Sequence, residues 1–303
     1  MKSWDSLVAQ GRVQAQVLIS AFTTYKLGGP VGYLAVVRSL FDLEKLATAQ
    51  AAEPLPVLVV GRGSNLVVSD RGFPGLVVHL EGELAAIEIG DVVAGGGGAS
   101  LPQLARAAVR ASHLGLEFMV GIPGTVGGAI RQNAGCFGQE VVDVLMAAEV
   151  FDLGREELTT VEPDALELSY RRSAVTSEQV VTRATFVTRQ GDPVDGERRM
   201  REITRWRKEH QPGGTLNAGS VFKNPPGDNA GRIIDSLGLK GLTIGGASVS
   251  EKHANFFVAK PGTSATEVYR LVVEVARRVR EATGTDLQLE VQFVGEFEEE
   301  RSG

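Results

Sequence analysis

The 303-residue chain is poor in the residues that build disulfides and metal centres. It has one cysteine, Cys136, so no intramolecular disulfide can form, as is typical of a chain kept in a reducing compartment. Its 4 histidines are scattered and show no spacing typical of a metal site. We therefore expect no metal, and we expect any demanding chemistry to come from an organic cofactor.

Long apolar runs and basic clusters are missing as well. No apolar run approaches the roughly 20 residues that span a bilayer, and residues 1–5 lack the basic start and apolar stretch of a signal peptide. The net charge is −6, and no long run of lysine and arginine would attract nucleic acid. We expect a cytoplasmic protein that binds neither nucleic acid nor membrane and shows no sign of an obligate protein partner.

Glycine is abundant instead, with 37 residues. They gather in five clusters, at 61–63, 95–98, 121–128, 135–138 and 213–219. One such cluster fits a tight turn between strands, but five between β-rich segments favour a backbone that approaches a ligand closely.

The patterns of helix and strand indicate an α+β chain, and its length predicts two or three small domains. A strand at 33–39 is followed by a helix that Asp42 caps and Pro54 ends, and then by the strand 56–61. A charged helix at about 194–209 forms the main boundary. The acidic tail after Gly295 is expected to fray. Further helices are expected near 101–113, 230–237 and 264–283, and further strands near 144–152, 156–160, 180–189, 255–258 and 287–295.

The first glycine loop does not match the common nucleotide motifs. In Gly61-Arg62-Gly63-Ser64-Asn65, Leu66 occupies the third glycine position of a dinucleotide fingerprint, and a strand follows rather than a helix. The sequence has no Gly-Lys pair for a Walker A loop and no G-x-S-x-G elbow. The remaining interpretation is a nest of backbone N–H groups that binds a diphosphate. Residues 121–128 would form a second nest, and the two would hold one extended dinucleotide.

Several motifs, in order along nearly the whole chain, resemble the UDP-N-acetylenolpyruvoylglucosamine reductases. TTYKLGGP, VGRGSNLVVSDRGFPGLVV and GIPGTVGGAIRQNAG are similar to the FAD-binding half of that family. SYRRS, NAGSVFKNP, AGRIIDSLGLKG, VSEKHANFFV and LQLEV are similar to its catalytic half. Gln132 stands where the family often has methionine, and LQLE where it often has LEPE. The short interval from Tyr170 to Ser220 resembles the compact type II branch, so substrate closure differs from that of the longer branch.

The resemblance implies an α+β fold with a vanillyl-alcohol-oxidase (PCMH-type) FAD-binding domain in two α+β subdomains, and a smaller α+β substrate-binding domain. The expected boundaries are 1–80 and 81–208 for the FAD-binding subdomains and 209–290 for the substrate-binding and catalytic domain, with residues of about 291–303 packing back on the first. FAD is expected to bind non-covalently. Its expected contacts are Gly61, Arg62, Gly63, Ser64, Asn65, Leu66, Gly121, Pro123, Gly124, Thr125, Gly127, Gly128, Ala129, Asn133 and Gly135, with Tyr25 and Lys26 as weaker candidates.

The resemblance also implies the reaction. NADPH reduces FAD and leaves, and the enolpyruvyl ether of UDP-N-acetylglucosamine then receives a hydride at C3 and a proton at C2, in the synthesis of a peptidoglycan precursor. NADPH and the substrate are expected to use one pocket in turn.

Three residues are the expected catalytic groups. Arg171 would stabilise the substrate carboxylate, Ser220 would protonate C2, and Glu290 would bind near the enolpyruvyl group. Tyr170, Lys223 and Asn224 are the expected substrate contacts. Taken from the residues alone, Arg171 also fits a surface strand, Ser220 a turn, Glu290 a solvent-facing position and Lys223 a solvated surface.

Two alternatives are a flavin oxidase of the same fold and a non-catalytic nucleotide sensor. Oxidases of this fold often tether FAD through histidine or cysteine, and Cys136 lies beside a glycine cluster. In a sensor, Arg171, Ser220 and Glu290 would have no reason to lie around one site.

The mode of flavin attachment distinguishes a flavin oxidase from a reductase of the resembled family. If FAD is bound non-covalently, denaturing the purified protein will release the yellow flavin into the supernatant. Flavin that stays with the precipitated protein would instead support a tether and the oxidase.

Overall fold

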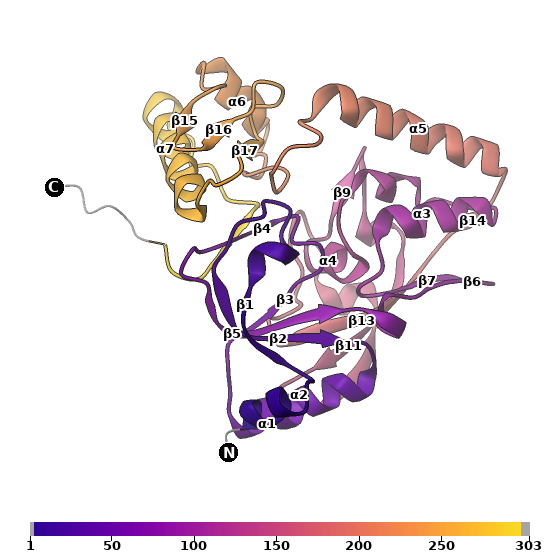
Figure 1. The fold of residues 1–303 in the computed structure, drawn as a ribbon. Coiled ribbons are helices and arrows are strands. Elements are labelled where there is room, and N and C mark those ends of the chain that lie inside the picture. The colour runs from indigo at the N-terminus through magenta and orange to yellow at the C-terminus, as the bar shows by residue number, and fades with distance from the viewer. Residues whose placement is uncertain (1–2, 298–303) are drawn as a thin grey trace. The chain divides into compact units, whose positions relative to one another are not determined.

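The structure is a computed structural model that describes residues 3–297 (Figure 1). It divides into two compact units, each built from separate stretches of chain. Unit 1 contains 1–16, 32–62 and 74–206, and unit 2 contains 17–31, 63–73 and 207–303. The expected fraying of the tail concerns mainly residues 298–303, which lie outside the described residues.

The first layer of unit 1 is a four-stranded sheet in the order β1-β2-β5-β3, in which β3 and β5 run parallel. Helices α1 and α2 lie side by side (Figure 1). Their shared core includes Trp4, Leu43 and Leu76, all fully buried. The elements are α1 (Ser3–Ala9), β1 (Gln14–Leu18), β2 (Pro30–Val37), α2 (Leu40–Ala52), β3 (Val57–Val59) and β5 (Phe73–Leu80).

The strand and helix expected at the start of this layer are confirmed, but the helix cap is corrected. Ser39, not Asp42, is the N-cap of α2, and its side chain accepts from the Asp42 N–H. Asp42 is the third helical residue and accepts from the N–H of Ser39. The two side chains form a capping box, in which an acidic residue three positions after the cap is easily mistaken for the cap itself.

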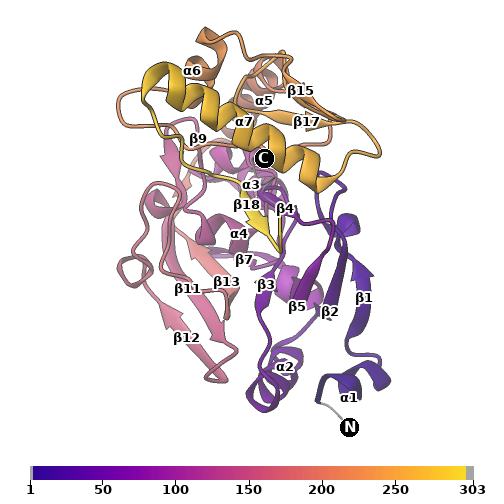
Figure 2. The ribbon, with the colours of Figure 1, turned by 90° about the vertical axis from the view of Figure 1, so that its left-hand side faces the viewer.

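The second layer of unit 1 is a five-stranded antiparallel sheet in the order β12-β11-β13-β7-β6 (Figure 2). Strands β11, β12 and β13 confirm those expected near 144–152, 156–160 and 180–189. A large apolar core packs against it, including Leu104, Phe118 and Phe186. The elements are β6 (Ile87–Ile89), β7 (Val93–Gly96), α3 (Leu101–Arg110), α4 (Val126–Arg131), β11 (Leu145–Asp152), β12 (Glu157–Val161) and β13 (Gln179–Phe186).

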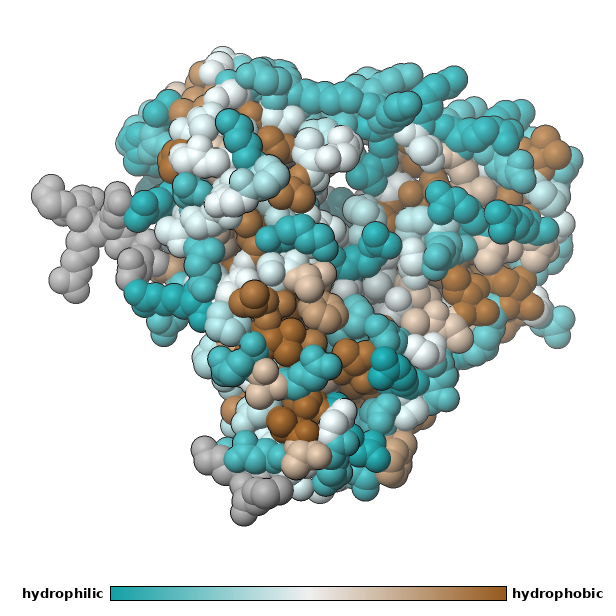
Figure 3. Space-filling view, in the orientation of Figure 1, coloured by the Kyte–Doolittle hydropathy of each residue, from teal (hydrophilic) through white to brown (hydrophobic). Residues whose placement is uncertain are grey.

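Short strand pairs, 3-10 turns and most of one charged helix complete unit 1. The expected charged helix is confirmed as α5 (Pro193–His210), whose outer side is a hydrophilic band in Figure 3. Strands β9 (Gly135–Cys136) and β10 (Gln139–Glu140) form a hairpin, and β8 (His113–Leu114) pairs antiparallel with the distant β14 (Arg189–Gln190). The 3-10 turns of this unit are η2 (Gly82–Ala85), η3 (Glu117–Gly121), η4 (Val141–Asp143) and η5 (Pro163–Leu166).

Unit 2 is a three-stranded antiparallel sheet, β15-β16-β17, against which α7 packs (Figure 2). Val268, Leu271 and Val275 on α7 join its core. Strand β18 pairs in parallel with β4. The elements are η1 (Ile19–Phe22), β4 (Leu66–Val68), α6 (Ala230–Ser236), β15 (Thr243–Ile244), β16 (Ala247–Val249), β17 (Phe257–Ala259), α7 (Ala265–Thr283) and β18 (Gln292–Val294). Helices α6 and α7 confirm those expected near 230–237 and 264–283.

Asp70, from the segment that follows β4, binds the N-terminus of α7. Its carboxylate accepts from the N–H groups of Ala265 and Thr266 at 2.8 and 2.9 Å, and from the Thr266 hydroxyl at 2.7 Å. The N-cap Ser264 accepts from the next N–H, that of Glu267. Because the first N–H groups of a helix have no partner within the helix and its N-terminus is electropositive, this carboxylate joins two segments 195 residues apart.

Replacing Asp70 by alanine should lower the free energy of unfolding by about 1–2 kcal/mol, because the first turn of α7 loses its acceptors. Urea unfolding measures the change. The matched control is Asp286→Ala, whose exposed ion pair with Arg280 should contribute almost nothing. Equal effects of the two substitutions would contradict the assigned role of Asp70.

Candidate functional site

The first glycine loop offers backbone donors. Within either unit, none of the described residues accepts a hydrogen bond from the backbone N–H groups of residues 61–65. A Cβ on Gly63 would lie 2.3 Å from the Phe22 carbonyl oxygen, and the φ of Gly63 is +59°. A Cβ on Gly61 would lie 2.3 Å from Thr125 Oγ1. A loop that only glycine can form and whose N–H groups point away from internal acceptors suits the diphosphate of a dinucleotide such as FAD.

The second glycine segment differs from the expected nest, because its N–H groups are already used. Those of Val126 and Gly127 donate to the carbonyls of Ala99 and Gly97, and that of Gly128 donates to Thr125 Oγ1. A Cβ on Gly127 would lie 3.2 Å from the Gly97 oxygen. Glycine serves here to let two backbones approach, and the segment does not present a row of free donors.

The other residues expected at the cofactor divide by burial. Leu66 and Ala129 lie in the apolar cores, at 6% and 3% exposure. Gly121 ends the 3-10 turn η3, and Gly135 lies in β9. In the loop between Gly121 and α4, Pro123 is exposed and Gly124 is half-buried.

Arg171 lies in a tight turn of unit 1. Ser169 and Arg172 exchange two backbone hydrogen bonds, of 3.1 and 3.0 Å, and leave Tyr170 and Arg171 at the tip. The φ of Arg171 is +55°, a conformation that glycine usually occupies at this position of a turn. Asn133 Nδ2 donates to the Ser169 carbonyl, and the Ser173 hydroxyl donates to the Arg131 carbonyl, so both sides of the turn are bound to the end of α4.

Glu140 is a neighbour of Arg171 that the sequence patterns did not reveal. Arg171 Nη1 lies 3.3 Å from Glu140 Oε1, and Arg171 Nη2 donates to the Gly135 carbonyl at 3.4 Å. Gly135 and Glu140 face one another across the β9–β10 hairpin. No local pattern links residues 31 positions apart, so only the folded hairpin reveals the pair. The guanidinium carbon of Arg171 also lies 4.9 Å from the ring centre of Tyr170, which is 45% exposed.

Ser220 and Glu290 are brought together in unit 2. The backbone of Ser220 pairs with that of Phe256, and the Glu290 N–H donates to the carbonyl of Val221 at 2.8 Å. Asn65 Nδ2 donates to the Glu290 carbonyl at 2.9 Å. The first glycine loop is therefore bound directly to the segment that carries Glu290, and Glu290 in turn binds Val221, the residue after Ser220.

Asn255 supports this arrangement and was not singled out from the sequence. It is 3% exposed, its Oδ1 accepts from the Phe222 N–H, and its Nδ2 donates to the Phe222 carbonyl. Its own carbonyl accepts from the Val221 N–H. A buried amide satisfied on both sides holds the strand after Ser220 in one register.

The expected substrate contacts in unit 2 lie just beyond this strand. The Lys223 N–H donates to the Gln288 carbonyl, and its side chain is half-buried. The Oδ1 atom of the exposed Asn224 accepts from the Ala230 N–H at the start of α6. This contact orients the amide group of Asn224.

The two weaker flavin candidates have different surroundings. Tyr25 is 1% exposed and donates its hydroxyl to the Phe257 carbonyl at 2.8 Å, and its burial raises the pKa of the phenol. Tyr25 is enclosed in the core of unit 2. Lys26 Nζ donates to the Ala21 carbonyl. The preceding Thr24 donates to the Asn217 carbonyl and so connects this segment with the one that leads to Ser220.

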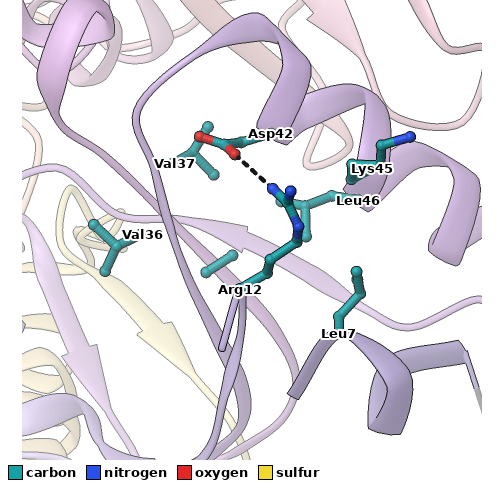
Figure 4. Close-up of a pocket in the computed structure, with 8 residues that line it drawn as sticks. Leu7, Arg12, Val36, Val37, Asp42, Lys45 and Leu46 are labelled. Carbon is teal, nitrogen blue, oxygen red and sulfur yellow. Dashed lines mark hydrogen bonds and ion pairs between the residues drawn. The ribbon is translucent and has the colours of Figure 1, made fainter. Parts of the chain in front are cut away.

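Other reactive groups show no catalytic arrangement. Cys136 is half-buried against the core of unit 1, and burial lowers the pKa of His253 below its usual value. No cluster of three potential metal ligands occurs within residues 3–297, and no helix there has both the length and the apolar character needed to cross a bilayer. A pocket between β2 and α2 contains none of the candidate residues and is bridged by the Arg12–Asp42 ion pair (Figure 4).

Comparisons with known proteins give matches over most of the chain. Residues 32–162 match the family model of an FAD-binding domain, and residues 211–294 match that of the C-terminal domain of UDP-N-acetylenolpyruvoylglucosamine reductase. The UDP-N-acetylenolpyruvoylglucosamine reductase of Paramagnetospirillum magneticum is 42% identical over 94% of this chain and 93% of its own. Reductase 2 of Symbiobacterium thermophilum is 40% identical over 94% and 93%.

A solved structure is similar over the same length. The chain matches the crystal structure of the UDP-N-acetylenolpyruvylglucosamine reductase of Thermus caldophilus with a TM-score of 0.82 and 38% identity, over 94% of this chain and 99% of that one. The expected α+β architecture, with a PCMH-type FAD-binding domain and a smaller C-terminal domain, is confirmed.

The packing at Gly61 predicts how flavin binding can be broken. Gly61→Ala should sharply lower the flavin content of the purified protein, because the new methyl group would meet Thr125 Oγ1 and Cγ2. Gly90→Ala is the control, since nothing lies within 4 Å of a Cβ there. The ratio of flavin to protein absorbance measures the outcome. Full flavin content in Gly61→Ala would remove this loop from the cofactor site.

Proposed function

This chain belongs to the UDP-N-acetylenolpyruvoylglucosamine reductase family, and from that premise we propose how its residues reduce UDP-N-acetylglucosamine enolpyruvate to UDP-N-acetylmuramate. The enzyme is an FAD-dependent oxidoreductase with NADPH as its reductant. Bound FAD supplies the hydride that passes from NADPH to C3 of the substrate. The protein must hold the substrate, stabilise the charge that develops on it and deliver a proton to C2.

Ser220 is the proposed proton donor to C2. A serine hydroxyl is a weak acid, so it can protonate only a strongly basic carbon held close to it. The observation that carries this role is the fixed backbone around Ser220, bonded on one side to the segment of Phe256 and Asn255 and on the other to that of Glu290. These bonds fix the backbone of Ser220 relative to the segment that carries Glu290.

Arg171 and Glu290 would stabilise the substrate. A planar guanidinium can bind the enolpyruvyl carboxylate through two parallel hydrogen bonds, and these strengthen as charge builds on the carboxylate during hydride transfer. Glu290 would bind beside the enolpyruvyl group and polarise it. The bond from Asn65 to the Glu290 carbonyl supports this role, because it ties Glu290 to the glycine loop proposed for FAD.

The remaining assignments concern binding. Lys223, as a point charge, and Asn224, as an amide donor, are proposed for the UDP diphosphate, with Tyr170 as a further substrate contact. The loop 61–65 is proposed for the FAD diphosphate, with Thr125 and the small residues of 121–129 beside it. We further propose that NADPH and the substrate occupy one pocket in turn and that the reaction takes place in the cytoplasm.

The family assignment favours this function over the flavin oxidase. The sensor is also disfavoured, because two of the three proposed catalytic residues already lie together within unit 2.

Ser220→Ala should separate the two halves of the reaction. In the anaerobic wild-type enzyme, one equivalent of NADPH should bleach the flavin, and UDP-N-acetylglucosamine enolpyruvate should then restore its absorbance. In Ser220→Ala, bleaching by NADPH should stay within about twofold, whereas reoxidation by the substrate should slow by about 10²-fold or more, the usual contribution of a general acid.

Ser236→Ala is the matched control, since this exposed serine of α6 donates only to the Ile233 carbonyl. Equal loss in both half-reactions would refute Ser220 as the proton donor. If the substrate leaves the reduced wild-type flavin unchanged until air is admitted, the flavin oxidase becomes the favoured function.

A further inference from the structure

We infer that Glu140 is the positioning residue for Arg171 and that it sets the orientation in which the guanidinium meets the substrate carboxylate. This inference rests on the function proposed above for Arg171. Both residues lie in unit 1, where their contacts form a closed group around the turn 169–172.

The carboxylate of Glu140 has a different side-chain partner for each oxygen. Oε1 lies 3.3 Å from Arg171 Nη1, and Oε2 accepts from Asn133 Nδ2 at 2.9 Å. The same Nδ2 donates to the Ser169 carbonyl at 3.1 Å, at the start of the arginine turn. The contacts therefore close a ring from Ser169 through Arg171, Glu140 and Asn133 back to Ser169.

Asn133 makes this ring rigid. It is fully buried, and its Oδ1 accepts from the Val142 N–H at 3.0 Å. Its backbone is in the left-handed region, with a φ of 39°. A buried amide with its donors and its acceptor all engaged has one orientation, so it fixes the carboxylate plane of Glu140.

The hairpin fixes the plane of the guanidinium in turn. Glu140 and Gly135 are cross-strand partners, and each accepts from a different terminal nitrogen of Arg171. Two of its five N–H donors are thereby assigned to neighbours on one hairpin, which determines where the planar fork points. The turn sets the Cα position of Arg171, and Glu140 with Gly135 sets the direction of its head group.

Stability alone is a poor explanation for this ion pair. The side chains are 17% and 30% exposed, and pairs that retain contact with water usually contribute little to folding. A carboxylate beside an arginine that must bind an anion also weakens the attraction for that anion. The orientation that Glu140 imposes is a benefit that offsets this cost.

Asp143 provides a control that distinguishes a positioning role of Glu140 from a role in local structure alone. Glu140 also forms a capping box with Asp143, in which each side chain accepts from the other residue's N–H. Asp143→Asn removes one negative charge from the same turn but does not touch Arg171. Glu140→Gln removes the charge that holds Arg171 and keeps the size of the side chain.

The test compares Glu140→Gln and Asp143→Asn, each in the wild-type and in the Arg171→Lys background, using the anaerobic half-reactions. Glu140→Gln should slow flavin reoxidation by the substrate about 10- to 100-fold, the range that misplacement of a catalytic group by about 1 Å produces. Flavin content, thermal unfolding midpoint and reduction by NADPH should stay close to wild type. Asp143→Asn should leave both half-reactions within about twofold.

The Arg171→Lys background tests whether Glu140 acts through the arginine. There Glu140→Gln should add less than about a twofold further loss, since coupled residues are not additive. A full, additive loss in that background would overturn the inference, as would wild-type reoxidation in Glu140→Gln or an equal fall in both half-reactions. If Arg171→Lys itself leaves reoxidation unchanged, the proposed role of Arg171 fails, and the inference fails with it. If Arg171→Lys is impaired while Glu140→Gln is normal, the inference fails alone.

Discussion

The close backbone contact between Gly97 and Gly127 is the constraint on which the candidate site of unit 1 depends. The Gly127 N–H donates to the Gly97 carbonyl at 2.8 Å, and a Cβ on Gly97 would lie 1.8 Å from the Val181 oxygen. Only glycine allows α4 to approach β7 and β13 this closely. Thr125, at the start of α4, then contacts Gly61, and the end of α4 binds both sides of the arginine turn through Asn133 and Arg131.

In unit 2, a buried polar network holds the segments that carry the candidate residues. Asn255 holds the strand after Ser220 through bonds to Val221 and Phe222, and Glu290 binds the other side of the same strand. Asn65 extends the network to the glycine loop. Because every buried member has a partner, the network favours one register over its alternatives and so fixes the backbones of Ser220 and Glu290 relative to each other.

The two units thus supply different parts of the proposed reaction, one the arginine turn and the other Ser220 and Glu290. In both units the proposed catalytic residue depends on a neighbour that does not itself react, Glu140 for Arg171 and Asn255 for Ser220. Such supports determine geometry to a precision that catalysis requires, which explains why they recur beside each candidate residue.

Local sequence patterns were sufficient for much of the fold. The charged stretch at about 194–209 and the pattern near 264–283 indicated α5 and α7 almost to their ends, and Leu66 at the third glycine position argued against a dinucleotide fingerprint. The motifs, taken together, identified the family and the cofactor. The capping residue of α2 was misjudged because Ser39 and Asp42 both fit the local rule, and only the geometry shows which one caps.

What the sequence by itself determined was the set of local elements, the glycine clusters and the family. Only the tertiary structure decided that one glycine loop offers donors while the other has its N–H groups occupied, and that Glu140 meets Arg171 and Asn65 meets Glu290. The reason is physical. Helix periods and caps depend on neighbours three or four residues away, whereas these contacts join residues 31 and 225 positions apart, and which distant groups meet is set by how whole elements pack.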